Sequence, residues 1–236
     1  MARARQGLVP LSGTIGDQVY YRRFGKTFVR RLPKEFNDRR SEGQLRQRAL
    51  FKAMLGMSAL LGSALQRGLT KEAHGRGHTE ANEFVRMNKS RFVYEEGKVS
   101  VDYASLELSY GSLAVVAITG CKKRGRKVKV TFRTDGCVGA KGSGDVVHFY
   151  AVEPAVGVCE LVASVDRDEG VAEFELPDLG EEAEGVKRFH LYAMAEKAST
   201  AKMPTLSAEE KMCNKKHRNI NRTVSRTVYV GMVEVK

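Results

Sequence analysis

The sequence predicts an α+β protein in which a basic N-terminal β-hairpin and two helices precede an antiparallel β-sandwich of immunoglobulin or fibronectin type III character. Three observations predict this class. Short β-type runs flank Gly25-Lys26, apolar residues recur at helical spacing after Ser41, and beyond Gly97 the apolar period falls to two. We expect two domains, residues 1–110 and 111–236, because each part is long enough to bury a core of its own.

The first predicted element is a hairpin within a glycine- and arginine-rich arm, residues 1–36. The runs 18–21 and 27–30 are rich in valine, threonine and aromatic residues, which favour strands. Gly25 and Lys26 between them are typical of a tight connection. Pro33 then ends the segment, because proline has no backbone N–H for a strand ladder.

Two helices are predicted next. From Ser41, which is a favourable N-cap, apolar residues recur three and four positions apart, at Leu45, Phe51, Met54, Leu55, Leu61 and Leu65. We expect this helix to end at Gly68, since glycine is common at helix C-termini. A second helix is predicted from Thr79 to Ser90, with Thr79 as its cap.

Short β segments at regular intervals predict the sandwich. Val99 to Tyr103 alternates first, and seven strands are then expected at residues 113–118, 127–133, 145–153, 158–165, 171–176, 186–197 and 223–235. The sequence contains no tryptophan, so the Cys-Trp-Cys core of antibody domains is not expected. The polar, basic connection 198–221 is too long for a hairpin loop, and we consider it a candidate interaction element.

The net charge of +12 is unevenly distributed. Residues 1–52 carry 13 Lys and Arg against 4 Asp and Glu, whereas residues 135–185 carry 2 against 13. A basic protein of this kind is expected to have an acidic partner.

The sequence also indicates a compartment. No apolar run reaches the roughly 18 residues of a membrane span, and polar residues and Pro10 follow Arg3 and Arg5 where a signal peptide needs an apolar stretch. The 4 cysteines are widely spaced and contain no CxxC motif. We therefore expect a cytoplasmic protein without a membrane contact, whose cysteines are free thiols buried as small apolar side chains.

The N-terminal hairpin is the candidate binding site. Its cations could hold phosphates, and its aromatic rings could stack on the bases of single-stranded nucleic acid. Hairpins also place aromatic residues on one face and solvated charge on the other, so a purely structural role stays open. The residues predicted to contact nucleic acid or another anionic partner, such as an acidic protein, are Arg22, Arg23, Lys26, Arg30, Arg31, Tyr20 and Tyr21.

Self-assembly is the alternative function. The basic arm of one copy could dock on the acidic segment 166–184 of the next, and such head-to-tail contacts generate rings or filaments. The chain would then be a structural homo-oligomer, for which an origin in a phage or mobile element is one option. Basic clusters at 122–127 and 215–218 are further candidate contact sites.

No catalytic or cofactor motif is found in the sequence. His74 and His78 have the spacing of two metal ligands on a helix, but Gly75 and Gly77 between them favour a loop. The glycine-rich stretch 139–144 departs from the spacing of a phosphate-binding loop. We expect a protein that is not an enzyme and that has no metal or cofactor.

Most of the chain, and the first 113 residues most specifically, also resembles an uncharacterised family of Bacteroidota bacteria. The residues that carry the resemblance lie at 13–16, 20–26, 30–33, 36–40 and 44–51, and again at the junction 101–113. Members of that family often have a tryptophan near the position of Tyr21, and Asn-Pro-Arg where this chain has Asn37-Asp38-Arg39. The resemblance implies a bacterial source and a β-rich C-terminal part, and it implies no activity.

Overall fold

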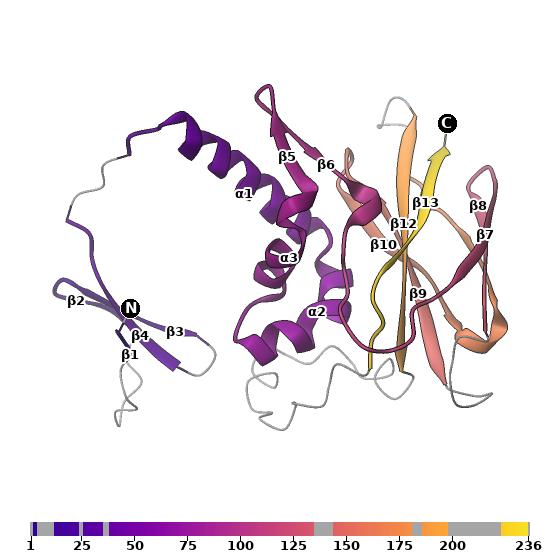
Figure 1. Cartoon of the computed structure of the whole chain (residues 1–236), viewed down its shortest axis with the longest axis horizontal. Helices are drawn as coiled ribbons and strands as arrows, with labels where there is room; N and C mark the ends of the chain where they lie inside the picture. Colours follow the sequence, from indigo (N-terminus) through magenta and orange to yellow (C-terminus); the bar gives the residue numbers. More distant parts are fainter. Residues whose placement is uncertain are drawn as a thin grey trace. The chain divides into compact units, whose positions relative to one another are not determined.

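The computed structural model describes residues 2–3, 12–23, 26–34, 38–134, 144–180, 186–197 and 223–235 (Figure 1). It divides into two compact units, of which the first includes residues 1–44 and the second begins at Leu45. The boundary between the units in the sequence lies at residues 44 and 45, and the helices after it share a core with the sheets that follow. The expected connection 198–221 and the clusters 181–184 and 215–218 lie outside the described residues.

The first unit is a four-stranded antiparallel sheet that contains the predicted hairpin. Its order is β1-β4-β3-β2, and its strands are β1 (Ala2–Arg3), β2 (Gly13–Ile15), β3 (Gln18–Arg23) and β4 (Lys26–Arg31). Gly16 lies in the turn between β2 and β3 with a φ of 60°, which glycine adopts at little cost. The hairpin prediction is confirmed.

The predicted first helix is two helices in the structure. They are α1 (Glu42–Leu60) and α2 (Gly62–Arg76), and the chain bends by 99° between them. The expected end at Gly68 is wrong, because α2 continues to Arg76 and is closed by Gly77, whose φ of 72° is left-handed. Glycine at position 68 allows α2 to lie close to the backbone of Leu108, because a Cβ at this position would be 2.3 Å from the Leu108 carbonyl oxygen.

The second predicted helix is confirmed. It is α3 (Glu80–Asn88), and the side chain of Thr79 accepts a hydrogen bond from the backbone N–H of Asn82. None of the described helices is by itself long and apolar enough to cross a membrane; α1 and α2 pass that test only when taken together across their bend.

After α3 the chain forms the short helix η1 (Lys89–Arg91) and a hairpin of β5 (Phe92–Glu95) and β6 (Lys98–Val101), followed by η2 (Tyr103–Ser105). The sequence predicts β6 but not its partner. Two antiparallel sheets then follow, with orders β11-β8-β7 and β10-β9-β12-β13. Their strands are β7 (Ile118–Arg124), β8 (Lys127–Phe132), β9 (Asp145–Glu153), β10 (Val158–Asp166), β11 (Val171–Glu175), β12 (Lys187–Lys197) and β13 (Val228–Val235), and η3 (Arg167–Glu169) follows β10.

One predicted strand is displaced. Within 113–118 only Leu113 forms a β-bridge, with Ser225, and β7 starts at Ile118. The reason is the buried Arg167, whose guanidinium donates hydrogen bonds to the carbonyl oxygens of Ala114 and Val115 at 2.8 and 3.0 Å. These carbonyls therefore bind a side chain in place of a neighbouring strand.

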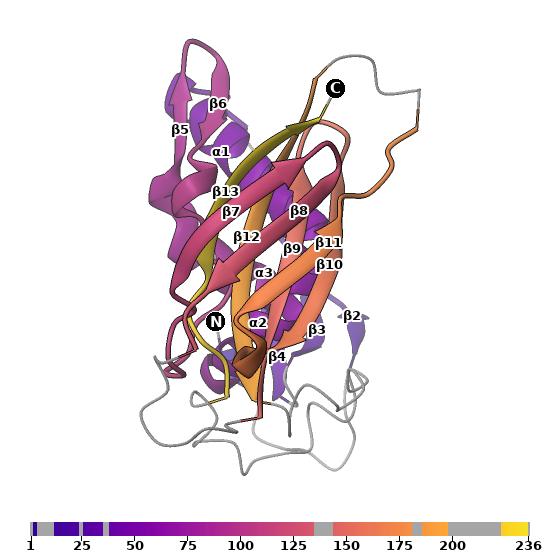
Figure 2. The same ribbon diagram turned by 90° about the vertical axis from the view of Figure 1, so that its right-hand side faces the viewer.

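The four-stranded sheet lies between the helices and the three-stranded sheet (Figure 2), and its central strands β9 and β12 are buried on both faces. Val147 and Phe149 of β9 face the three-stranded sheet, where they pack with Phe174 and other apolar residues. Tyr150 and Val152 of the same strand face the helices and belong to the other core. The body is therefore built of three layers, in which the central sheet contributes to two cores.

Candidate anion-binding surface on the N-terminal sheet

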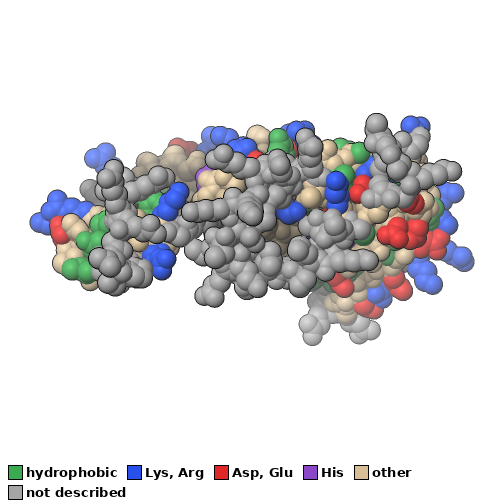
Figure 3. Space-filling view, turned by 90° about the horizontal axis from the view of Figure 1, so that it is seen from below, with side chains coloured by type: hydrophobic (Ala, Val, Ile, Leu, Met, Phe, Trp, Pro, Cys, Tyr) green, Lys and Arg blue, Asp and Glu red, His purple; other side chains and the backbone are tan. Residues whose placement is uncertain are grey.

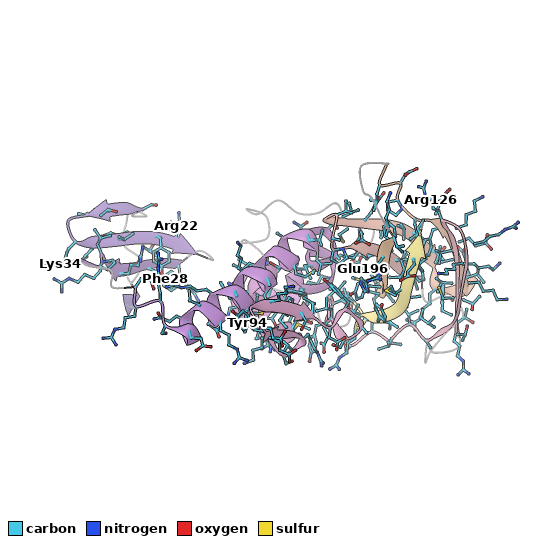
Figure 4. The ribbon with its side chains drawn as sticks, turned by 90° about the horizontal axis from the view of Figure 1, so that it is seen from above. Arg22, Phe28, Lys34, Tyr94, Arg126 and Glu196 are labelled. Atoms are coloured by element: carbon cyan, nitrogen blue, oxygen red, sulfur yellow. The ribbon has the colours of Figure 1, made fainter. Side chains whose placement is uncertain are left out.

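The register of β3 and β4 divides the predicted binding residues between two faces. Tyr21 pairs with Phe28 and Tyr20 with Val29, and alternate residues of a strand point to opposite sides. One face, here called the aromatic-pair face, carries Val19, Tyr21, Lys26, Phe28 and Arg30. The other carries Tyr20, Arg22, Val29 and Arg31 (Figure 4).

The aromatic-pair face combines stacked rings with cations. The rings of Tyr21 and Phe28 are 5.5 Å apart between centroids and nearly parallel, with an interplanar angle of 18°. Lys26 and Arg30 stand two residues before and after Phe28 on β4, so the three side chains form a row about 13 Å long at the usual rise per residue. A row of this kind can bind an extended polyanion that also offers flat rings.

The opposite face has weaker features. The Tyr20 hydroxyl donates a hydrogen bond to Gln18 Oε1 at 2.6 Å, and Arg31 Nε lies 3.0 Å from Asp17 Oδ2. Both members of the Arg31–Asp17 pair are well exposed, so the pair adds little stability. Asp17 is also the sole acidic residue among residues 1–34.

The structure brings together part of the predicted site. Lys26, Arg30 and Tyr21 share the aromatic-pair face with Phe28, whereas Tyr20, Arg22 and Arg31 lie on the other side. Arg23 pairs with Lys26 in the register, and its side chain is outside what the structure describes. The sequence prediction missed Phe28 as a site residue, because it placed Lys26 in the connection, whereas in the structure Lys26 belongs to β4 and pairs with Arg23, which sets Phe28 opposite Tyr21.

No side chain that the structure describes in this sheet is buried. Val19, Tyr21, Phe28 and Val29 are half-buried at most, and Ile15 is 57% exposed. A small sheet usually needs an apolar face packed on other groups to be stable. Both faces therefore offer apolar surface, and the positive charge surrounds it.

One cation of the second basic cluster (residues 122–127) and one cation just after it form ion pairs with acidic residues. Lys129 of β8 is paired with Glu173 of β11, and Arg126 at the β7–β8 turn is paired with Asp178. Acidic and basic side chains consequently alternate at this end of the molecule, at the right of Figure 3. The acidic segment of the sequence is thus partly matched by cations of the same chain.

A buried polar cluster, which the sequence analysis did not find, joins α2 to the central sheet. Arg67 Nη1 donates a hydrogen bond to Glu196 Oε2 at 2.9 Å, and its Nε donates to the Tyr150 hydroxyl at 3.2 Å. His148 Nε2 lies 3.4 Å from the same Glu196 oxygen, and its Nδ1 is 2.8 Å from Ser164 Oγ. Burial would raise the pKa of Glu196, but hydrogen bonds from His148 and Arg67 outweigh it, so the pKa is lowered.

The two candidate metal ligands each lie beside a carboxylate. His74 Nε2 is 3.5 Å from Glu80 Oε1, and His78 Nδ1 is 3.5 Å from the buried Glu83 Oε2. Across the described ranges, no group of three or more His, Cys, Asp or Glu side chains is arranged to hold a metal ion. Most of the glycine-rich stretch 139–144 lies outside those ranges.

Two of the four cysteines are described, and both are free. Cys159 is half-buried, and burial raises the pKa of its thiol to about 11. Cys121 is exposed, so the expectation of a buried thiol is wrong for this residue. It lies on the edge strand β7, which has a neighbour on one side only.

Comparison of the chain with models of known protein families and with curated proteins gives no match. The resemblance to the Bacteroidota family therefore stays a prediction.

Proposed function

We propose that the protein is a non-enzymatic binding protein whose aromatic-pair face contacts single-stranded nucleic acid. One observation carries the proposal: the half-exposed, stacked Tyr21 and Phe28 lie between Lys26 and Arg30 on a single face. Bases stack on aromatic rings regardless of their sequence, and phosphates bind the flanking cations with release of counterions. Residues 1–52 also carry 13 Lys and Arg against 4 Asp and Glu.

The test is binding of a fluorescent single-stranded 20-mer, measured by anisotropy at several salt concentrations. Lys26→Glu with Arg30→Glu should weaken binding at least tenfold and lower the salt slope by about 1.4, since each phosphate contact on a single strand contributes about 0.7. Phe28→Ala should cost about 1–3 kcal/mol through lost stacking.

The control is the double variant Lys122→Glu with Arg124→Glu, which makes the same change of charge on the β7–β8 hairpin. Both of these residues are exposed on β7, and we expect near-normal binding. If both charge-reversed variants lost the same affinity for the oligonucleotide, the loss would depend on the net charge alone, and a site on the N-terminal sheet would be refuted. If only the double variant Arg22→Glu with Arg31→Glu lost affinity, the contact with nucleic acid would lie on the opposite face.

Self-assembly is the second candidate, and the apolar surface around Ile15 and Val29 on that opposite face favours it. Light scattering on nuclease-treated protein separates the two functions. A monomer that carried nucleic acid before treatment supports binding. A defined oligomer that persists without nucleic acid supports assembly.

We further infer that the two packed sheets form a domain of the immunoglobulin or fibronectin type III class. The support is their strand order. Labelled A, B, C, C′, E, F and G in chain order, β7 to β13 are distributed as ABE and C′CFG, the order of fibronectin type III domains.

A further inference from the structure

Helix α1 has apolar side chains on two neighbouring sides. The inner side, with Met54 and Met57 towards its C-terminal end, packs into the core shared with α2, α3 and the central sheet. The outer side carries Phe51 and Leu55, which are 44% and 38% exposed. A surface helix needs one apolar stripe to pack on its own protein, so the outer stripe has no role in the core.

The outer residues have the spacing of a helix-packing site. Arg48, Phe51, Lys52 and Leu55 occupy positions i, i+3, i+4 and i+7, and together with Gln47 they line a shallow hollow on the helix surface. Four residues at this spacing form the hole that receives one side chain of a facing helix in knobs-into-holes packing. The floor is apolar, from Phe51 and Leu55, and the rim is cationic, from Arg48 and Lys52.

Charge determines which helix can fill this hole. From Gly43 to Lys71 the sequence contains no Asp or Glu, whereas Arg46, Arg48 and Lys52 follow one another along the first turns of α1. A second copy of α1 would bring like charges together, which is unfavourable. A phosphate backbone would match the rim but would leave the apolar floor uncovered.

We propose that α1 is a docking helix for an acidic amphipathic helix of another protein. An apolar side chain of the partner enters the hole between Phe51 and Leu55, and a carboxylate beside it pairs with Lys52 on the cationic rim. This inference is independent of the nucleic-acid site, because it uses a different element and a different ligand chemistry.

The experiment measures binding of two synthetic 21-residue helical peptides to the full chain by fluorescence anisotropy. Both peptides have Leu at the a and d positions of a heptad; one has Glu at e and g, and its twin has Lys. The Glu peptide should bind at least tenfold more tightly than the Lys peptide. Leu55→Ala and Phe51→Ala should each weaken binding of the Glu peptide about tenfold. The double variant Arg48→Glu with Lys52→Glu should bind the Lys peptide more tightly than the Glu peptide.

The control variant is Val93→Ala, which removes an apolar side chain that is 43% exposed on β5 and should change nothing. Oligonucleotide binding should also be unaffected by Leu55→Ala. Equal binding of both peptides, or no binding of either, would overturn the proposal. A dimer of the protein that Leu55→Arg dissociates would overturn it in favour of a second copy.

Discussion

At Gly68, a contact with a segment about 40 residues further along the chain determines which amino acid fits. The backbone of α2 at this point approaches the segment 108–110, and the Tyr110 N–H donates a hydrogen bond to the Gly68 carbonyl oxygen at 3.2 Å. A Cβ at Gly68 would lie 2.6 Å from the Cβ of Ser109 as well as against the Leu108 carbonyl. Glycine is therefore needed here for space, although it weakens the helix.

Gly68→Ala should destabilise the protein by about 1–3 kcal/mol, since the new methyl group would clash with the backbone of Leu108 and Ser109, which can shift only if the whole segment moves. Urea unfolding measures the change. Gly56→Ala is the matched control, because no atom lies within 4 Å of a Cβ placed there on α1. It should stabilise the protein by up to about 1 kcal/mol through helix propensity. Stabilisation by both substitutions would show that the close approach is not kept in solution.

At the scale of elements, α2 is held on the central sheet by polar as well as apolar groups. Arg67 donates to Glu196 and to Tyr150, and one turn later Lys71 Nζ donates to Thr223 Oγ1 at 2.6 Å. Glu196 is only 5% exposed. A carboxylate buried to this degree is strongly destabilising without its cation, so the pair fixes where α2 lies on the sheet.

Arg67→Met should lower the free energy of unfolding at pH 7 by about 3 kcal/mol, because it leaves the Glu196 carboxylate buried without Arg67. The folded pKa of Glu196 lies below its unfolded value, so the pair's stabilisation is complete above the unfolded pKa of about 4.3 and is lost as the pH falls through the folded pKa. The deficit of the variant should therefore shrink in acid. Chemical unfolding at pH 7 and at a series of pH values below 4.3 follows the change in this deficit.

Two further variants test this account. Arg188→Met removes one member of an exposed pair with Glu234 and should change stability by at most about 0.5 kcal/mol. Glu196→Gln in the Arg67→Met background should restore part of the lost stability, since no buried charge then remains. Purely additive losses would contradict coupling between Arg67 and Glu196.

At the scale of the molecule, the body has two cores that share one sheet. Phe84 of α3 is fully buried in the helical core, and Phe149 of β9 is fully buried between the two sheets. The strands β9 and β12 carry residues of both cores on alternating positions. The helices and the two sheets should therefore unfold as one cooperative unit.

Phe84→Ala and Phe149→Ala should each cost about 3–5 kcal/mol, from lost burial and the cavity left behind. In both variants the helical circular dichroism signal and the hydrogen-exchange protection of the β8 and β11 amides should disappear at the same urea concentration. Loss of the helical signal at lower urea in Phe84→Ala, with the β8 and β11 amides still protected, would show that the two cores are separate folding units.

The sequence by itself determined the local elements. The hairpin around residue 25, the cap at Thr79 and six of the seven strands follow from turn residues, capping and apolar period, all of which act between near neighbours. It also determined that basic residues outnumber acidic ones by 13 to 4 in the first 52 residues. The binding function and the site on the hairpin stay predictions that the proposed experiments test.

Tertiary structure decided the features that depend on distant partners. Three of these features are contacts between residues far apart in the chain: the close approach that requires glycine at position 68, the hydrogen bonds from Arg167 to the carbonyls of 114 and 115, and the buried Arg67–Glu196 pair. A fourth is the bend after Leu60, which allows α1 and α2 to pack in the same core. The pairing of the acidic segment with the β7–β8 cations is of the same kind. Residue period and spacing carry no information about such contacts, because burial and charge pairing depend on which surfaces meet when the chain folds.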